Sequence, residues 1–137
     1  EMAIFIPLIA AMGGNAGVQS SAIVVQGLAN KTMGFDSIFS RLFKEFSVGL
    51  LNGVLVSSLI FAYNLLFSDS WALSLTVSIS LITAVVFATL LGTAVPLVLD
   101  KYKVDPALAT GPFITTLNDI IGLFIYFGVG RLLYNYF

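Results

Sequence analysis

The chain contains no cysteine and no histidine. Without cysteine it has no disulfides and no thiolate zinc site, and without histidine it has no imidazole ligand and no serine–histidine catalytic pair. Any metal ion that this chain binds must therefore be held by oxygen atoms. Oxygen ligands suit hard cations such as Mg²⁺, Ca²⁺ and Mn²⁺.

Charge is also scarce. Only 9% of the 137 residues are charged and 58% are hydrophobic, and the mean hydropathy is +1.02. A soluble domain has about 25% charged residues, so this composition predicts a membrane protein. The six Lys and Arg residues are scattered and the net charge is −1. They form no basic patch, and we expect no nucleic-acid partner.

Four long apolar runs follow one another along the chain. Residues 2–30, 46–68 and 70–99 carry no charge, and residues 106–130 carry only Asp119. Each run exceeds the ~20 residues that a helix needs to cross the hydrocarbon core. The sequence therefore predicts an all-α membrane protein with four transmembrane helices, which form a single transmembrane domain over residues 1–137.

The loops predict the orientation. Basic residues gather in the two loops that follow the first and third runs, at Lys31, Arg41, Lys44, Lys101 and Lys103. Arg131 is the only basic residue on the opposite side. Both basic loops are therefore expected in the cytoplasm, and both chain ends, including the C-terminus, outside. The first run begins at residue 2 with no basic flank before it. We therefore expect a fragment that is preceded by a further span.

The connection between the first two runs has helical periodicity. Its apolar residues are Phe35, Ile38, Phe39, Leu42, Phe43 and Phe46, and the opposite side carries Asp36, Ser40, Arg41, Lys44 and Glu45. This pattern predicts a short amphipathic helix at the cytoplasmic interface. A basic flank that only sets the topology explains the same residues. Farther along, Asp105 and Pro106 predict the start of the last helix, as N-cap and first helical residue.

The middle of the first run is polar and rich in glycine, with the sequence MGGNAGVQSS at residues 12–21. Gly13 and Gly17 form a small-residue stripe that continues to Ser20, Ser21 and Val24. A separate amide stripe consists of Asn15, Gln19 and Gln26. Glycines allow another helix or an ion to approach closely. Two interpretations stay open, which are tight helix packing with the amides as interhelical links, and the lining of a polar pore.

Asp119 lies near the middle of the last run, where a carboxylate costs on the order of 2.5–3.5 kcal/mol. It lies on a broad helical face that is polar on its cytoplasmic half and small around the acid, with Pro112, Thr115, Thr116, Gly122, Leu123 and Tyr126. Asn118 points about 100° away. Because Pro112 has no N–H, we expect the carbonyl of Leu108 to be free for water or an ion. The alternative for Asp119 is a structural carboxyl, protonated or bonded to amides of a neighbouring helix.

A single carboxylate at this depth limits the reactions and ligands that the chain could serve. Intramembrane aspartyl proteolysis needs two carboxylates that share a proton, so we expect no enzyme. One carboxylate per chain serves a divalent cation if the ion keeps its water, as Mg²⁺ tends to do, or if a dimer brings two copies of Asp119 together. An inside-negative potential of ~100 mV adds roughly 4–5 kcal/mol for a doubly charged ion moving inward, so no coupled pump is required.

Two segments resemble a known family. PLIAAMGGNAGVQSSAIVVQGLA at residues 7–29 and DPALATGPFITTLNDIIGLFIYF at residues 105–127 resemble the transmembrane domain of the MgtE family of magnesium channels. The similarity covers essentially the whole chain. It implies helices two to five of a five-helix domain, with the first helix and the N-terminal cytoplasmic regulatory domains missing from this chain. It also implies an integral protein of a bacterial or archaeal plasma membrane.

The resemblance further implies a site. Family members are homodimers whose pore lies between the subunits, lined by helices that match residues 4–28 and 107–131. The pore acid, which binds a largely hydrated Mg²⁺, falls on Asp119. The other candidate pore-lining residues are Gly13, Gly14, Asn15, Gly17, Gln19, Ser20, Gly111, Pro112, Thr115, Thr116 and Gly122. Many members carry a polar residue, often asparagine, where this chain has Gly111, so we expect a backbone carbonyl there in place of a side chain.

We therefore expect a passive, dimeric channel domain for Mg²⁺, with Mn²⁺ or Co²⁺ as further cargo. Two other functions stay open. The first is a secondary transporter coupled to H⁺ or Na⁺ with Asp119 as the carrier, for which flux would follow a pH or Na⁺ gradient at zero voltage. The second is a non-transporting helical assembly subunit, whose thermal stability would not respond to Mg²⁺.

Overall fold

The computed structural model describes residues 1–31, 35–67 and 70–136, and in that part of the chain every regular element is a helix. In order, the elements are η1 Met2–Phe5, α1 Ile6–Ala29, α2 Phe35–Phe67, α3 Trp71–Lys101, η2 Pro106–Ala109 and α4 Pro112–Tyr134, where η denotes a 3₁₀ helix. The stretches long and apolar enough to cross a membrane are Met2–Ala29, Phe39–Phe67, Trp71–Lys101 and Pro112–Tyr134. The predicted all-α class with four candidate membrane spans is confirmed.

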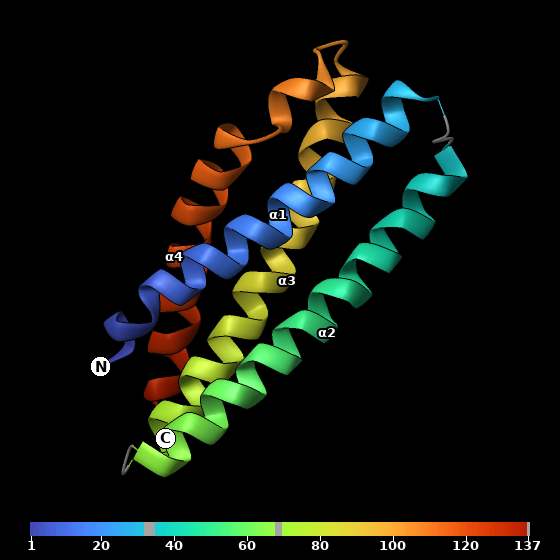
Figure 1. Ribbon diagram of the computed structural model, residues 1–137. Helices are drawn as coiled ribbons and strands as arrows, with labels where there is room; N and C mark the ends of the chain where they lie inside the picture. The colour runs from blue at the N-terminus through green and yellow to red at the C-terminus, as the bar shows by residue number, and fades with distance from the viewer. Residues whose placement is uncertain (32–34, 68–69, 137) are drawn as a thin grey trace.

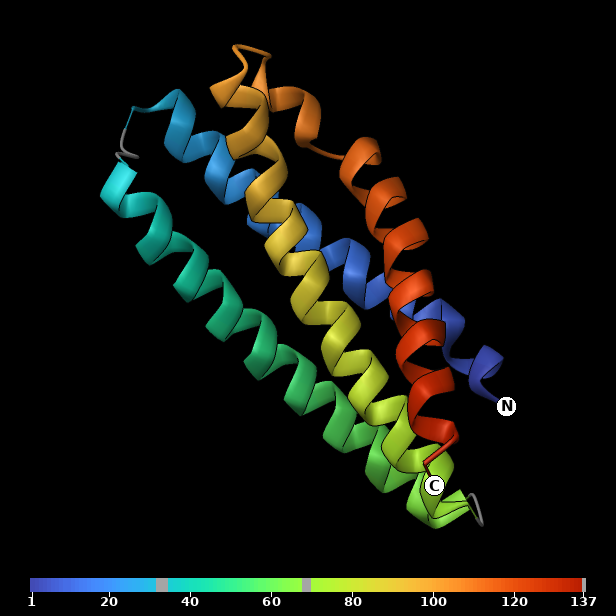
Figure 2. The ribbon, with the colours of Figure 1, turned by 180° about the vertical axis from the view of Figure 1, so that it is seen from behind.

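Helix α3 is the central helix of the bundle (Figure 1). Helices α1, α2 and α4 each pack along it, and α1 also packs along α4. Helices α2 and α4 lie on either side of α3 in both views (Figures 1 and 2). The buried apolar core is built on Val77, Leu81 and Val85 of α3, against which Ile9 and Tyr126 pack. This arrangement leaves α1 and α4 side by side, with one shared face that α3 does not cover.

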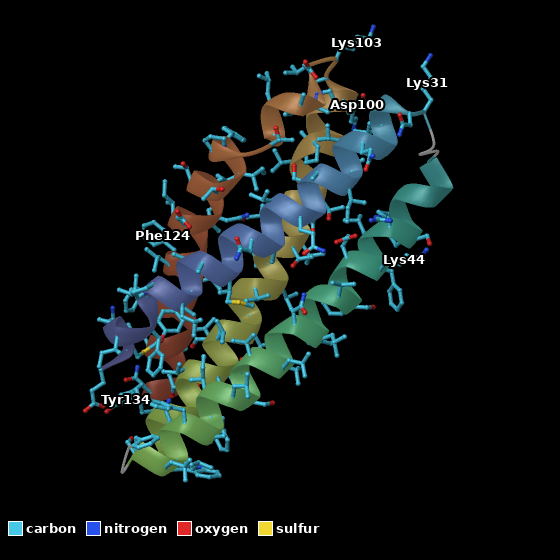
Figure 3. The ribbon with its side chains drawn as sticks, in the orientation of Figure 1. Lys31, Lys44, Asp100, Lys103, Phe124 and Tyr134 are labelled. Atoms are coloured by element: carbon cyan, nitrogen blue, oxygen red, sulfur yellow. The ribbon has the colours of Figure 1, made fainter. Side chains whose placement is uncertain are left out.

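The two ends of the bundle differ in charge. Figure 3 shows Lys31, Asp100 and Lys103 at one end, whereas Tyr134 lies toward the other. Both chain ends also lie toward the end with Tyr134 (Figure 1). Lys31 and Lys103, one from each predicted basic loop, therefore share one end of the molecule, whereas Lys44 lies farther along α2 (Figure 3).

The segment predicted as a separate interfacial helix is helical, but it is the first part of α2. Helix α2 is continuous because residues 35–48 contain no proline and no glycine that would end it. Phe39 and Phe43 are strongly exposed, at 82% and 71%, whereas Glu45 is only 5% exposed. The amphipathic pattern was therefore wrong in placing Glu45 on an exposed polar face. The side chains of residues 35–38, which belong to the same pattern, lie outside the described part of the chain.

The last apolar run forms two helical segments rather than one. Asp105 caps η2 as predicted, since its Oδ1 accepts a hydrogen bond from the Ala107 N–H at 3.0 Å, but η2 ends at Ala109. Gly111 then has φ +55° and ψ −127°, a backbone conformation that glycine adopts without strain. Pro112 follows as the first residue of α4, a position at which its missing N–H has no cost.

Pro112 therefore starts a helix and does not interrupt one. The expectation of one continuous helix through Pro112 is wrong, because the chain changes direction at Gly111 before α4 begins. The Leu108 carbonyl as a free acceptor stays a prediction. The Gly111 carbonyl accepts hydrogen bonds from the Thr115 N–H and from Thr115 Oγ1, both at 3.1 Å. These two bonds secure the first turn of α4, which carries one side of the candidate site.

Helices α1 and α3 approach backbone to backbone at Gly17 and Gly92. A Cβ atom on Gly92 would lie 2.8 Å from the Gly17 Cα and 2.9 Å from its carbonyl carbon. We expect Gly92→Ala to lower the free energy of unfolding by about 2 kcal/mol or more, because backbone atoms cannot rotate aside as a side chain can. Thermal unfolding in detergent measures the effect.

Gly128→Ala is the matched control for this experiment. Among the described residues, no atom outside its own helix turn lies within 4 Å of the Cβ position at Gly128, and alanine is favoured over glycine in a helix by up to about 1 kcal/mol. This variant should melt at or slightly above the temperature of the parent protein. Equal melting temperatures for Gly92→Ala and the parent would contradict the close contact between the two helices.

Candidate functional site

A groove of about 880 Å³ lies between α1 and α4, open on one side. Helix α1 lines it with Ala10, Ala11, Gly14, Asn15, Val18 and Gln19, and the break before α4 and its first turns line it with Gly111, Pro112, Thr115, Thr116 and Asp119. The groove therefore joins the polar segment of the first span to the acidic segment of the last one.

Asp119 is the only ionisable residue among these lining residues. Its side chain is partly buried, and within residues 1–31, 35–67 and 70–136 its carboxylate has no hydrogen bond and no ion pair. No lysine or arginine is among the described residues that line the groove. A structural carboxyl would be expected to have such partners, because a buried charge without them is costly. The arrangement favours a carboxylate that meets a partner from outside the chain.

The other polar groups of the groove carry neutral oxygen atoms. Thr115 and Thr116 supply hydroxyls from α4, and Asn15 and Gln19 supply carboxamides from α1. In the described part of the chain, no three Asp, Glu, His or Cys residues lie close enough to hold a metal ion together. One carboxylate among neutral oxygens is a poor site for a dehydrated divalent cation. It suits an ion that keeps its water and is bound through water-mediated hydrogen bonds.

The two stripes predicted on the first span face different ways. Gly13 and Gly17 are buried, and a Cβ atom on Gly17 would lie 2.9 Å from the Asn118 Cγ. Asn15 and Gln19 line the groove, and Asn15 is exposed. The packing interpretation therefore fits the glycine stripe, and the polar-lining interpretation fits the amide stripe.

Gly14 is the glycine of α1 that faces the acid. A Cβ atom there would lie 3.6 Å from the Thr115 Cγ2 and 4.0 Å from the Asp119 Oδ1. The absence of a side chain at Gly14 lets the backbone of α1 line the groove close to the Asp119 carboxylate.

The groove gathers most of the predicted site residues but not all of them. Those that line it are Gly14, Asn15, Gln19, Gly111, Pro112, Thr115, Thr116 and Asp119. Gly13, Gly17, Ser20 and Gly122 are not among its lining residues. Ser20 instead donates a hydrogen bond to the Glu45 Oε2 at 2.7 Å, and Gly122 is buried in α4. The Gly111 carbonyl, expected to face an ion, is occupied by its two hydrogen bonds from Thr115.

Sequence reasoning missed two polar residues that the structure buries. Asn118 is 2% exposed, and neither polar atom of its carboxamide has a hydrogen-bond partner in the described residues. Glu45 is 5% exposed and forms an ion pair of 3.0 Å with Arg41. Periodicity on a single helix could not reveal either one, because their burial depends on which neighbouring helix covers them.

Two apolar residues that line the groove were not predicted but could have been found from the sequence. Ala11 and Val18 lie one helical turn before and after Asn15, so they belong to the same face of α1. The signal was the i−4 and i+3 spacing around a residue already placed in the lining.

The chain matches the family model described as "Divalent cation transporter" over residues 6–129. It is similar to three proteins named "Magnesium transporter MgtE". It is 41% identical to that of Bacillus subtilis over 128 residues, which covers 93% of this chain and 28% of the relative. It is 37% identical to that of Enterococcus faecalis over 137 residues, which covers 99% of this chain and 30% of the relative. It is 37% identical to that of Thermus thermophilus over 133 residues, which covers 96% of this chain and 29% of the relative.

This chain thus spans 28–30% of the length of these relatives. The family match begins at the first residue of α1 and reaches beyond Asp119 in α4, so it includes both sides of the groove. By the family model and by these identities, the chain belongs to the MgtE family of divalent cation transporters.

Proposed function

We propose that this chain is the pore domain of a passive Mg²⁺ channel, in which a largely hydrated ion passes along the groove between α1 and α4. The observation that carries the proposal is the Asp119 carboxylate, which has no partner within the described residues and faces neutral oxygen donors. Family membership supports a divalent cation as cargo, and the names of the relatives support Mg²⁺. The same oxygen donors would accept Mn²⁺ or Co²⁺.

The size of the groove is compatible with a hydrated ion. Six water molecules occupy about 180 Å³ at about 30 Å³ each, which is well below the groove volume of about 880 Å³. An ion that keeps its water avoids the dehydration that Mg²⁺ resists. Its charge then meets Asp119 through water, while Thr115, Thr116, Asn15 and Gln19 accept or donate hydrogen bonds at the edge of the water shell.

A second copy of the chain would complete the pore. The open side of the groove exposes carboxamides, hydroxyls and a carboxylate, and such groups are costly in contact with lipid tails. A twofold partner would cover them and would add a second Asp119, giving a site with two negative charges. Homodimerisation is therefore part of the proposal.

The proposal also includes the setting in the membrane. The basic loops with Lys31 and Lys103 face the cytoplasm and the C-terminus lies outside, as the positive-inside rule predicts. We include in the proposal a preceding helix and cytoplasmic regulatory domains, which the greater length of the relatives would accommodate, since this chain spans 28–30% of them.

Uptake into proteoliposomes tests the passive mechanism. With pH and Na⁺ equal on both sides, we expect Mg²⁺ to enter when a K⁺ diffusion potential makes the lumen negative. A potential of ~100 mV is worth about 4.6 kcal/mol for a divalent ion, which corresponds to roughly 10³-fold accumulation at equilibrium. Entry that requires a pH or Na⁺ gradient at zero voltage would contradict a channel and would favour a coupled carrier.

A further inference from the structure

A second carboxylate, that of Glu45, lies buried in the bundle away from the groove. Glu45 Oε2 accepts a hydrogen bond from Ser20 Oγ of α1 at 2.7 Å, and Glu45 Oε1 lies 3.0 Å from an amino nitrogen of Arg41, one turn earlier on α2. Both carboxylate oxygens therefore have partners. The Arg41 side chain is 27% exposed, and its buried Nε has no partner in the described residues.

This contact joins two helices that pack mainly on others. Helix α2 packs along α3, and α1 packs along α3 and α4. In Figure 1, α1 crosses in front of α3 while α2 runs beside α3. The hydrogen bond from Ser20 to Glu45 therefore links α2, which does not line the groove, to the helix that provides half of the lining.

The position of Ser20 connects this link to the groove. Ser20 directly follows Gln19, which lines the groove, and successive residues on a helix point about 100° apart. A bond that holds Ser20 toward α2 therefore also sets the direction of Gln19. One turn earlier, Gly17 packs against Asn118, the residue before Asp119, so a rotation of α1 would disturb both sides of the groove.

The chemistry of the link favours a directional role over simple adhesion. A buried ion pair adds little stability compared with apolar packing of the same volume, but removal of one partner leaves a costly unpaired charge. The ion pair with Arg41 lies within α2 and fixes the direction of the carboxylate. The hydrogen bond from Ser20 is directional, so it restricts the rotation and the sliding of α1 more than an apolar contact would. Its main effect is therefore geometric.

We propose that Glu45 is a positioning residue for the cation groove. Together with Ser20 and Arg41 it forms a clasp, the Ser20–Glu45–Arg41 clasp, that holds the lining face of α1 from outside the groove. This inference rests on the proposed transport function. It adds a way in which a displacement of α2 would change the groove without any contact between α2 and the ion.

The absence of cysteine from this chain allows a direct test of groove geometry. A Val18→Cys reporter places one thiol in the lining, and its rate of modification by a water-soluble methanethiosulfonate reagent is measured in the full protein freed of any other cysteine. In this background we expect Glu45→Gln to raise the modification rate at least about fivefold, because the neutral carboxamide loses the Arg41 ion pair and accepts the Ser20 hydrogen bond more weakly, so that α1 is held less firmly. In the protein without the reporter, the same substitution should lower Mg²⁺ uptake roughly tenfold.

Two further variants separate positioning from folding. Ser20→Ala removes the hydrogen bond but leaves the ion pair between Arg41 and Glu45, so it provides a milder test if Glu45→Gln fails to fold. We expect it to change modification and uptake in the same direction, and Ser20→Thr, which keeps the hydroxyl, to restore both toward the parent values. Ser47→Ala is the matched control, because within the described residues that exposed hydroxyl on α2 bonds to the Phe43 carbonyl of its own helix, at 2.9 Å, and to no other helix.

The outcomes for the clasp and for the channel are distinguishable. Modification and uptake within twofold of the parent in both Glu45→Gln and Ser20→Ala would overturn the clasp, while a loss of uptake in Asp119→Asn would still support the pore acid. If Asp119→Asn transports normally, the channel proposal fails, and the modification rates still decide whether Glu45 positions α1.

Discussion

Replacing Asp119 with asparagine is expected to lower Mg²⁺ uptake into proteoliposomes by roughly 100-fold or more. The substitution preserves the shape of the side chain and removes only the charge. At a separation of about 5 Å, which leaves one layer of water, charges of −1 and +2 attract by about 1.7 kcal/mol at a dielectric constant of ~80 and by about 6.6 kcal/mol at ~20. A loss of about 3 kcal/mol, within that interval, corresponds to a ~100-fold change in binding.

The fold of this variant should be unchanged. In the described part of the chain the Asp119 carboxylate has neither a hydrogen bond nor an ion pair that asparagine would break. The melting temperature without Mg²⁺ and the size-exclusion profile should therefore match those of the parent. Asp119→Glu is the matched control, since it keeps the charge and shifts it by one methylene, and it should retain a large part of the uptake. Normal uptake in Asp119→Asn would rule out Asp119 as the pore acid.

The membrane-spanning helices could be predicted because their signal is compositional. Apolar runs longer than ~20 residues with at most one charge have few alternatives to a membrane helix, and each of the four runs overlaps a helix long enough to cross a membrane. The break between η2 and α4 was missed because hydropathy does not report backbone angles. Gly111 followed by Pro112 was a local signal for it, since glycine tolerates the turn and proline favours the first position of a helix.

The candidate site was predictable in its residues more than in its geometry. Helical spacing separates Asn15 from Gly17, but it does not say which of them faces the groove. That choice is made by α3, whose Gly92 lets the Gly17 backbone approach closely and so turns the amides of α1 outward. The burial of Glu45 was missed for the same reason. Its hydrogen-bond partner Ser20 lies on another helix, 25 residues earlier in the chain.

Gly14 is expected to control access to the acid. A leucine at this position would project from a point 4.0 Å from the Asp119 Oδ1 and 3.6 Å from the Thr115 Cγ2. It would fill the space in which water and ion meet the carboxylate and would make it apolar. We expect Gly14→Leu to reduce Mg²⁺ uptake by roughly 100-fold. Without room for a hydrated Mg²⁺ ion beside it, the Asp119 carboxylate loses about 3 kcal/mol or more of its interaction with that ion. Proteoliposome uptake measures this loss.

Adjacent glycines provide the control for this experiment. A Cβ atom on Gly13 would meet the Ala88 Cβ at 3.7 Å, which is ordinary van der Waals contact, and this position faces α3 rather than the groove. Gly13→Ala and Gly14→Ala gain the same helix propensity, so a difference between them reports only on the groove. Uptake should stay near the parent value in Gly13→Ala, fall moderately in Gly14→Ala and be nearly abolished in Gly14→Leu. A Gly14→Leu protein that folds and still transports at the parent rate would place the ion path elsewhere, because no hydrated cation could then pass beside Asp119.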